Sequence, residues 1–285
     1  MSLVLFDSWL MLVWIFITSF IPGALLAISI LKRSELRLFE KILIGFGIGF
    51  SLPQLIPYLL SFVGIKFSFG IAILSTLVFY AIAIALFLKE KPFEGFKFEF
   101  PKLSVEELKN IEAPVWSCIV AAILVIIMLS AFVLRISSSS PVFSELDPYY
   151  YTYGAQQIVT LGEMPLNDET AWFEDVNGDD ISETKVDHRS HPVLLYMEAA
   201  WYSFYTMGAD AAQYDNYLLA LVAGAYPPVA AALAFFFLYL FFAANYPRQF
   251  ALIGAAVASF VPILVLKLSS GEMEVQPYAF FALGF

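Results

Sequence analysis

Charged side chains are scarce in this sequence: they make up 14% of its 285 residues, whereas soluble domains carry roughly 25%. Hydrophobic residues account for 60% of the chain, and the mean hydropathy is +0.78. A chain with so few charges cannot cover the surface of a soluble domain. The composition therefore excludes a soluble protein and predicts an all-α polytopic membrane protein.

Cysteine is nearly absent as well. The one cysteine, Cys118, lies inside an apolar run, so the chain has no intrachain disulfide and no cysteine-based metal site. We interpret Cys118 as a packing residue. A cleavable signal is not expected either, because no base precedes the first apolar stretch and that stretch, Trp9 to Leu31, is too long for a signal core.

Basic residues are few and unevenly placed. The formal net charge of −10 argues against nucleic acid as a partner. Between Glu145 and Asp215 lie fourteen of the 25 acids and only two bases, Lys185 and Arg189. The acidic character is thus concentrated in one segment in the middle of the chain.

Hydropathy predicts six membrane spans, each close to the roughly 20 residues that a helix needs to cross a bilayer. They are Trp9–Leu31, Ile42–Val63, Phe69–Leu88, Val115–Leu134, Tyr217–Phe242 and Phe250–Leu266. Four bases follow the first span, which by the positive-inside rule makes that loop cytoplasmic and the N-terminus external; they are Lys32, Arg33, Arg37 and Lys41. The expected location is the cell membrane.

Two units are expected along the chain. Residues 1–112 form a three-span unit with a cytoplasmic linker, in which residues 105–111 are predicted to form an amphipathic helix. Residues 113–285 begin a second transmembrane domain with a large external loop, 136–215. A last apolar run of about eight residues starts at Tyr278, too short to span, so we expect the chain to be cut inside a seventh span.

Two helices are expected within the external loop. One continues from Tyr151 to Leu161, where Gly162 ends it. The other covers His191 to Met207, which at about seventeen residues with Glu198 in the middle is marginal for a span. We interpret it as a helix lying on the outer membrane surface.

Two acidic motifs stand out from the loops. Glu145-Leu-Asp147-Pro-Tyr149-Tyr150 precedes the first loop helix, and Glu272-Met-Glu274 follows the sixth span, so the predicted topology places both on the outer face. Carboxylates there can hold Mg²⁺ or Mn²⁺, and tyrosine rings can contact a sugar or a lipid. The alternative interpretation is a pair of solvated loops.

The order of these motifs resembles the catalytic subunit of oligosaccharyltransferase of the archaeal and eukaryotic type, a membrane glycosyltransferase of the GT-C class. The likeness includes Ala225-Tyr-Pro-Pro228 opening a span, Pro262 in the next, and the Ser270–Glu274 stretch after it. It covers Val115 to Phe285. The resemblance implies a GT-C-like helix bundle that transfers a glycan from a polyprenyl-linked donor to asparagine of an acceptor polypeptide on the external face.

The resemblance also implies roles for particular residues. Asp147 would bind the metal and contact the acceptor amide, with Glu145 as the first acid of its pair. Glu272 and Glu274 would complete the metal ligands, and Tyr149 and Tyr150 would contact substrate. His191 would lie near the lipid phosphate, or alternatively have only a structural or exposed role.

The chain departs from the family pattern at four points. Thr152-Tyr153 stands where a basic residue often follows the first motif, and Glu272 stands where aspartate is usual. The three spans before Val115 are extra to the family plan, and no Trp-Trp-Asp motif for acceptor recognition is present.

Two other functions stay open at this stage. One is a polyprenyl-phosphate-sugar-dependent transferase acting on protein hydroxyls or lipid glycans, which would not depend on a second metal-binding pair. The other is a transporter or a non-catalytic membrane scaffold. A transporter is expected to carry ionisable groups near the middle of its spans, and this sequence has almost none there.

Overall fold

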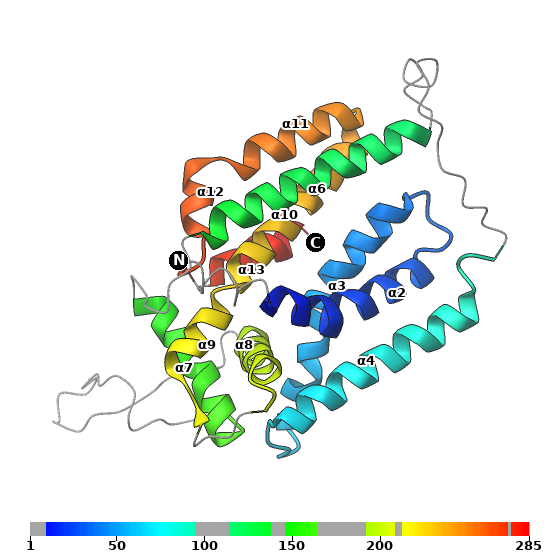
Figure 1. The fold of residues 1–285 in the computed structure, drawn as a ribbon. Coiled ribbons are helices and arrows are strands. Elements are labelled where there is room, and N and C mark those ends of the chain that lie inside the picture. Colours follow the sequence, from blue (N-terminus) through cyan, green and yellow to red (C-terminus); the bar gives the residue numbers. More distant parts are fainter. Residues whose placement is uncertain are drawn as a thin grey trace, which may run out of the picture.

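The structure is a computed structural model that describes residues 10–94, 114–137, 146–164, 192–208, 213–272 and 275–284. Every regular element in these ranges is a helix (Figure 1). Five helices are long and apolar enough to cross a membrane: Leu10–Ile30, Leu38–Ser61, Phe69–Glu90, Val115–Ile136 and Asn216–Asn245. The prediction of an all-α, multi-pass membrane protein is confirmed to this extent.

The first three spans follow the hydropathy closely. The first contains a widened turn, η1 (Phe16–Phe20), followed by α2 (Ile21–Ile30). That turn ends just before Pro22, which has no N–H to donate to the preceding turn. The helix α3 (Leu38–Ser61) begins four residues earlier than predicted and keeps Pro53 and Pro57 inside it, and α4 (Phe69–Glu90) is capped by the Ser68 side chain.

Glycines bring α2 and α3 into backbone contact. A Cβ atom on Gly23 would lie 2.0 Å from the carbonyl oxygen of Gly45, and one on Gly49 would lie 2.0 Å from the carbonyl oxygen of Ser19. Gly45 and Gly49 are four residues apart, the spacing with which small residues let membrane helices approach closely. The two helices pack through their backbones at these points.

The start of α3 is tied to the C-terminal half of the chain through Glu40, which is almost fully buried. One oxygen of Glu40, Oε2, accepts from the backbone N–H of Arg37 at 2.8 Å, which caps the helix. The other, Oε1, lies 3.7 Å from Nη2 of Arg248 and 3.5 Å from the hydroxyl of Tyr239.

The central helix of the bundle is α10 (Tyr226–Asn245), which continues the short helix α9 (Asn216–Ala223). In the most apolar window of this span 67% of the residues are buried, against 22% for α4, so α10 is surrounded by protein while α4 is left to face lipid. Around it pack α3, α6 (Pro114–Ile136), α11 (Arg248–Ser259) and α13 (Val275–Gly284).

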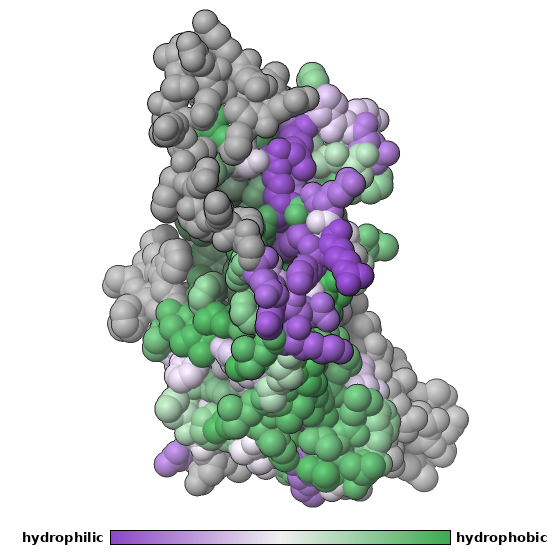
Figure 2. Space-filling model, turned by 90° about the vertical axis from the view of Figure 1, so that its right-hand side faces the viewer, coloured by the Kyte–Doolittle hydropathy of each residue, from purple (hydrophilic) through white to green (hydrophobic). Residues whose placement is uncertain are grey.

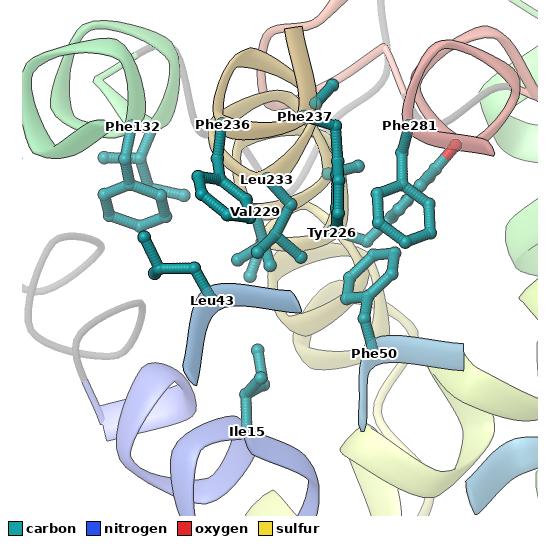
Figure 3. Close-up of a cluster of buried hydrophobic side chains, with 14 of the residues drawn as sticks. Ile15, Leu43, Phe50, Phe132, Tyr226, Val229, Leu233, Phe236, Phe237 and Phe281 are labelled. Carbon is teal, nitrogen blue, oxygen red and sulfur yellow. The ribbon is translucent and has the colours of Figure 1, made fainter. Parts of the chain in front are cut away.

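Figure 3 shows how this core is filled. Side chains of α10 meet those of α3, α6 and α13; the labelled members include Leu43, Phe50, Phe132, Val229, Leu233, Phe236, Phe237 and Phe281. The ring of Phe50 lies edge-on to that of Phe281 with their centroids 5.1 Å apart. The contact joins the second span to the last helix.

Two further helices cover one end of the bundle. They are α7 (Leu146–Leu161) and α8 (Pro192–Tyr205), which pack against each other and against α9. Figure 1 shows α8 end-on while α4 and α6 run across the view, so α8 crosses the direction of these spans. The predicted helix is confirmed, but Leu194 to Phe204 are all buried, so α8 packs inside the protein and does not lie open on a surface.

The sixth predicted span is not one helix. The structure places α11 (Arg248–Ser259) and α12 (Pro262–Lys267) there, separated by Phe260 and Val261. Pro262 cannot continue a helix from Ser259 without losing a backbone hydrogen bond and clashing with the preceding turn. The predicted span at Phe250–Leu266 is therefore interrupted and consists of two shorter helices. The amphipathic helix predicted at 105–111 lies outside the described residues.

Candidate functional site

The second acidic motif begins in a turn after α12. The Glu272 backbone N–H donates to the carbonyl of Ser269 at 3.1 Å, and Gly271 has a φ of +98°, a conformation that glycine adopts without strain. The Glu272 side chain is only 12% exposed, and its Oε2 lies 3.1 Å from Nζ of Lys267. A largely buried carboxylate is held there by one ammonium group.

This turn is anchored to the last turn of α6 by Arg135. The carbonyl of Arg135 accepts from the backbone N–H of Ser270 at 3.1 Å. Its guanidinium is fully buried, donates to the carbonyls of Ala131 at 3.0 Å and Ser259 at 2.8 Å, and lies 4.9 Å from the centre of the Phe235 ring. Sequence reasoning assigned no role to Arg135, and its burial could not be read from the sequence.

The first acidic motif lies at the start of a helix. The helix α7 begins at Leu146, five residues before the predicted start at Tyr151, so Asp147 and Pro148 lie in its first turn. Proline suits the first helical turn, and a carboxylate there is stabilised by the helix dipole. Tyr149 is 53% exposed, and its ring stacks with that of Tyr153 at 6.3 Å between centroids.

Both motifs belong to the same end of the bundle. The helix α7 packs against α9, and at the end of α9 a Cβ on Gly224 would come within 2.8 Å of Oγ of Ser270. The helix that carries Asp147 and the turn that carries Glu272 are therefore joined through α9. In Figure 1 the start of α7 and α12 lie together on the left.

Several predicted site residues fall outside this description. Glu145, His191 and Glu274 lie outside the described residues, as do the side chains of Asp147 and Tyr150. Among the side chains that the structure does describe, no group of three or more His, Cys, Asp or Glu residues is placed to hold a metal. The structure thus brings the elements of the two motifs together without defining a ligand set.

Sequence reasoning missed Glu198 as a site residue and treated it only as an argument against a span. Glu198 is fully buried in α8, and within the described part of the chain neither of its oxygens has a hydrogen-bond partner. The same holds for Nε1 of Trp201, one helical turn away, and for Oγ1 of Thr152 in α7. Burial raises the pKa of Glu198 to about 8, which favours the protonated acid at neutral pH.

We expect Glu198→Gln to stabilise the protein at pH 8 but not at pH 4.5. In the unfolded chain Glu198 ionises near its ordinary pKa of 4.5, whereas in the folded protein it stays protonated up to about 8, so wild-type stability falls as the pH rises through this window. At pH 8 the glutamine variant should be more stable by about 2 kcal/mol or more. Thermal unfolding of the purified protein between pH 5 and 8.5 measures this difference.

The matched control is Glu163→Gln, because Glu163 is 53% exposed and paired with Lys66. Its unfolding temperature should change little with pH relative to wild type. A Glu198→Gln variant that gains no stability between pH 5 and 8.5 would mean that the Glu198 carboxylate is compensated in the folded protein.

No protein-family model, no curated protein and no solved structure matches this chain.

Proposed function

We propose that this chain is part of a membrane glycosyltransferase that transfers a glycan from a polyprenyl phosphate or diphosphate carrier to asparagine of an acceptor polypeptide on the external face. The observation that carries the proposal is the docking of the Ser270–Glu272 turn on the end of α6, through the 3.1 Å hydrogen bond from Ser270 N to Arg135 O. The chain continues from that end of α6 toward α7, whose first turn holds Asp147.

The donor set suits a divalent cation. Asp147, Glu272 and Glu274 would supply carboxylate oxygens to Mn²⁺ or Mg²⁺, with Glu145 next to Asp147 as a further acid. The partly buried Glu272 fits this role, since only Lys267 neutralises it among the contacts described above. When bound, the metal neutralises charge that develops on the phosphate oxygens of the leaving group.

The protein side chains would handle the two substrates. Asp147 orients the acceptor amide, and the exposed ring of Tyr149 offers a face to a sugar or to the carrier lipid, with Tyr150 beside it in sequence. His191, just before α8, would contact the carrier phosphate. The helix α8, buried from Leu194 to Phe204, packs against α7 and gives that helix a rigid support.

A transporter is less well supported. Across the five spans the Asp, Glu, Lys and Arg residues all lie within four residues of a helix end; they are Glu40, Lys41, Lys89, Glu90 and Arg135. Ion-coupled carriers place such groups near the bilayer midplane. The charges of this bundle are instead placed at its two ends.

The test is Mn²⁺ binding by the purified protein. Binding is measured as the decrease in the electron paramagnetic resonance signal of free Mn²⁺. We expect Asp147→Asn and Glu272→Gln each to weaken binding at the same single site by at least about tenfold, because each removes an oxygen ligand. Lys267→Met should strengthen binding, since the lysine ammonium and the cation compete for the Glu272 carboxylate.

The control is Glu163→Gln, which removes an exposed acid and should leave binding unchanged. If neither Asp147→Asn nor Glu272→Gln affects Mn²⁺ binding, the shared metal site is refuted. Transfer assays with asparagine-containing and serine-containing peptides then distinguish a transferase that acts on asparagine from one that acts on protein hydroxyls. Transfer to hydroxyls that persists without metal would favour the polyprenyl-phosphate-sugar-dependent transferase.

A further inference from the structure

A second site is formed at the opposite end of the bundle, where α2 and α4 end and α3 and α6 begin. Figure 2, which looks onto the right-hand side of Figure 1, shows hydrophilic residues gathered in a band over this end. A cavity of about 620 Å³ opens here between the α2–α3 connection, the start of α6 and the chain after α4. Its volume is in the range of small-molecule binding pockets.

The charged residues described in the lining of this cavity are all basic. Lys32, Arg37 and Lys41 line it, and no carboxylate of the described residues does. The ammonium groups of Lys32 and Lys41 donate to backbone carbonyls, those of Glu90, Lys32 and Ser34. Among the residues that the structure describes, neither lysine has a carboxylate partner.

Two of the nearby acids already have partners. Glu40 uses its oxygens on the backbone of Arg37, on Arg248 and on Tyr239. Glu94, beyond α4, lies 3.9 Å from Nζ of Lys91. In the described part of the chain Nη1 of Arg37 is buried and has no hydrogen-bond partner, which leaves a charged donor to be satisfied by a ligand.

The rest of the wall is apolar and includes Ile28, Phe39, Phe93 and Ala121. A free phosphate would meet the bases but leave this wall unfilled. A phospholipid satisfies both parts, because its phosphate pairs with Lys and Arg while an acyl chain covers the apolar wall. The cavity also lies at the ends of spans, where lipid headgroups are found.

We propose that this cavity binds an anionic phospholipid, with Lys32, Arg37 and Lys41 contacting the phosphate and Ile28, Phe39 and Phe93 contacting the acyl chain. The site is separate from the proposed donor and metal site, which lies at the other end of α6. Burial, and then the neighbouring Arg248 guanidinium, lowers the pKa of Arg37, a cost that a bound anion relieves.

The one cysteine of the chain, Cys118, is exposed and lines the cavity, so its interpretation as a packing residue is wrong and it can serve as a reporter. The test measures the rate at which maleimide labels Cys118 in nanodiscs. We expect phosphatidylglycerol nanodiscs to slow labelling at least about threefold relative to phosphatidylcholine nanodiscs. The Arg37→Gln/Lys41→Gln variant should lose this protection, while Lys66→Gln, which removes an exposed base elsewhere, should keep it.

Three outcomes would overturn the proposal. Equal labelling in the two lipids would show that no anionic lipid occupies the cavity. Full protection by inorganic phosphate in phosphatidylcholine nanodiscs would identify a soluble anion as the ligand. Protection unchanged in the double variant, or in Lys32→Gln/Lys41→Gln should the first variant fail to fold, would place the lipid elsewhere. None of these readouts depends on metal binding or on glycan transfer.

Discussion

Replacing Gly49 with leucine is expected to prevent the protein from folding. Any Cβ at this position would lie 2.0 Å from the carbonyl oxygen of Ser19 and 2.7 Å from its carbonyl carbon, which are backbone atoms that cannot rotate away. To admit the side chain, α3 would have to separate from η1 and α2, and Phe50 and Leu43 of the core lie on the same helix. We expect a loss of about 5 kcal/mol or more, comparable to the whole stability of a marginally stable domain.

The measurement is the yield of monodisperse protein in size-exclusion chromatography, together with its unfolding temperature. The matched control is Gly70→Leu near the start of α4, where the nearest atom to an added Cβ is the Ser68 hydroxyl at 3.7 Å. That variant should resemble wild type. A Gly49→Leu protein that elutes and melts as wild type does would show that α3 is not in backbone contact with η1 at this position.

Most of the bundle was predictable because membrane spans follow directly from hydropathy. Four predicted spans coincide with helices to within a few residues, and a fifth, Tyr217–Phe242, is one candidate span built from α9 and α10. The backbone contact of α2 and α3 carried a signal that went unused, namely the spacing of Gly45 and Gly49.

The prolines show why hydropathy alone does not predict where a helix breaks. Pro53 and Pro57 lie inside α3 without ending it, whereas the chain breaks before Pro262. The difference lies in tertiary contacts, because the carbonyl of Ser259, at the end of α11, accepts a hydrogen bond from Arg135. A partner more than a hundred residues away in the sequence stabilises the break, and no local pattern indicates it.

The candidate site, too, was predictable from the sequence only in part. Counting spans placed Asp147 and Glu272 on one face, and this stays a prediction. In the structure α7, which carries Asp147, packs against α9, and Gly224 at the end of α9 approaches Ser270. The pairing of Glu272 with Lys267 depends on the turn that follows α12, and the burial of Glu198 depends on packing between helices, which a single sequence does not display. The ligand roles of Asp147, Glu272 and Glu274 stay predictions.

Arg135→Met is expected to destabilise the protein and loosen the turn that carries Glu272. The substitution preserves apolar bulk but removes the donors to Ala131 O and Ser259 O and the contact with the Phe235 ring. Hydrogen bonds from charged groups contribute about 1.5–3 kcal/mol each, and a buried carbonyl left without a partner adds a desolvation cost. We expect a loss of about 3 kcal/mol, or a fall of roughly 6–12 °C in the unfolding temperature.

The Arg135→Lys variant distinguishes the contribution of the positive charge from that of the planar guanidinium. Lysine keeps the positive charge, but as a compact ammonium it cannot reproduce the planar fork that reaches two carbonyls and stacks on Phe235. Most of the loss should therefore remain, and Lys66→Met, at an exposed base, should cost little. If Arg135→Lys restores wild-type stability, charge alone matters. If Arg135→Met lowers stability but leaves Mn²⁺ affinity unchanged, the Ser270–Glu272 turn is held by its backbone hydrogen bond to residue 135 and not by the guanidinium.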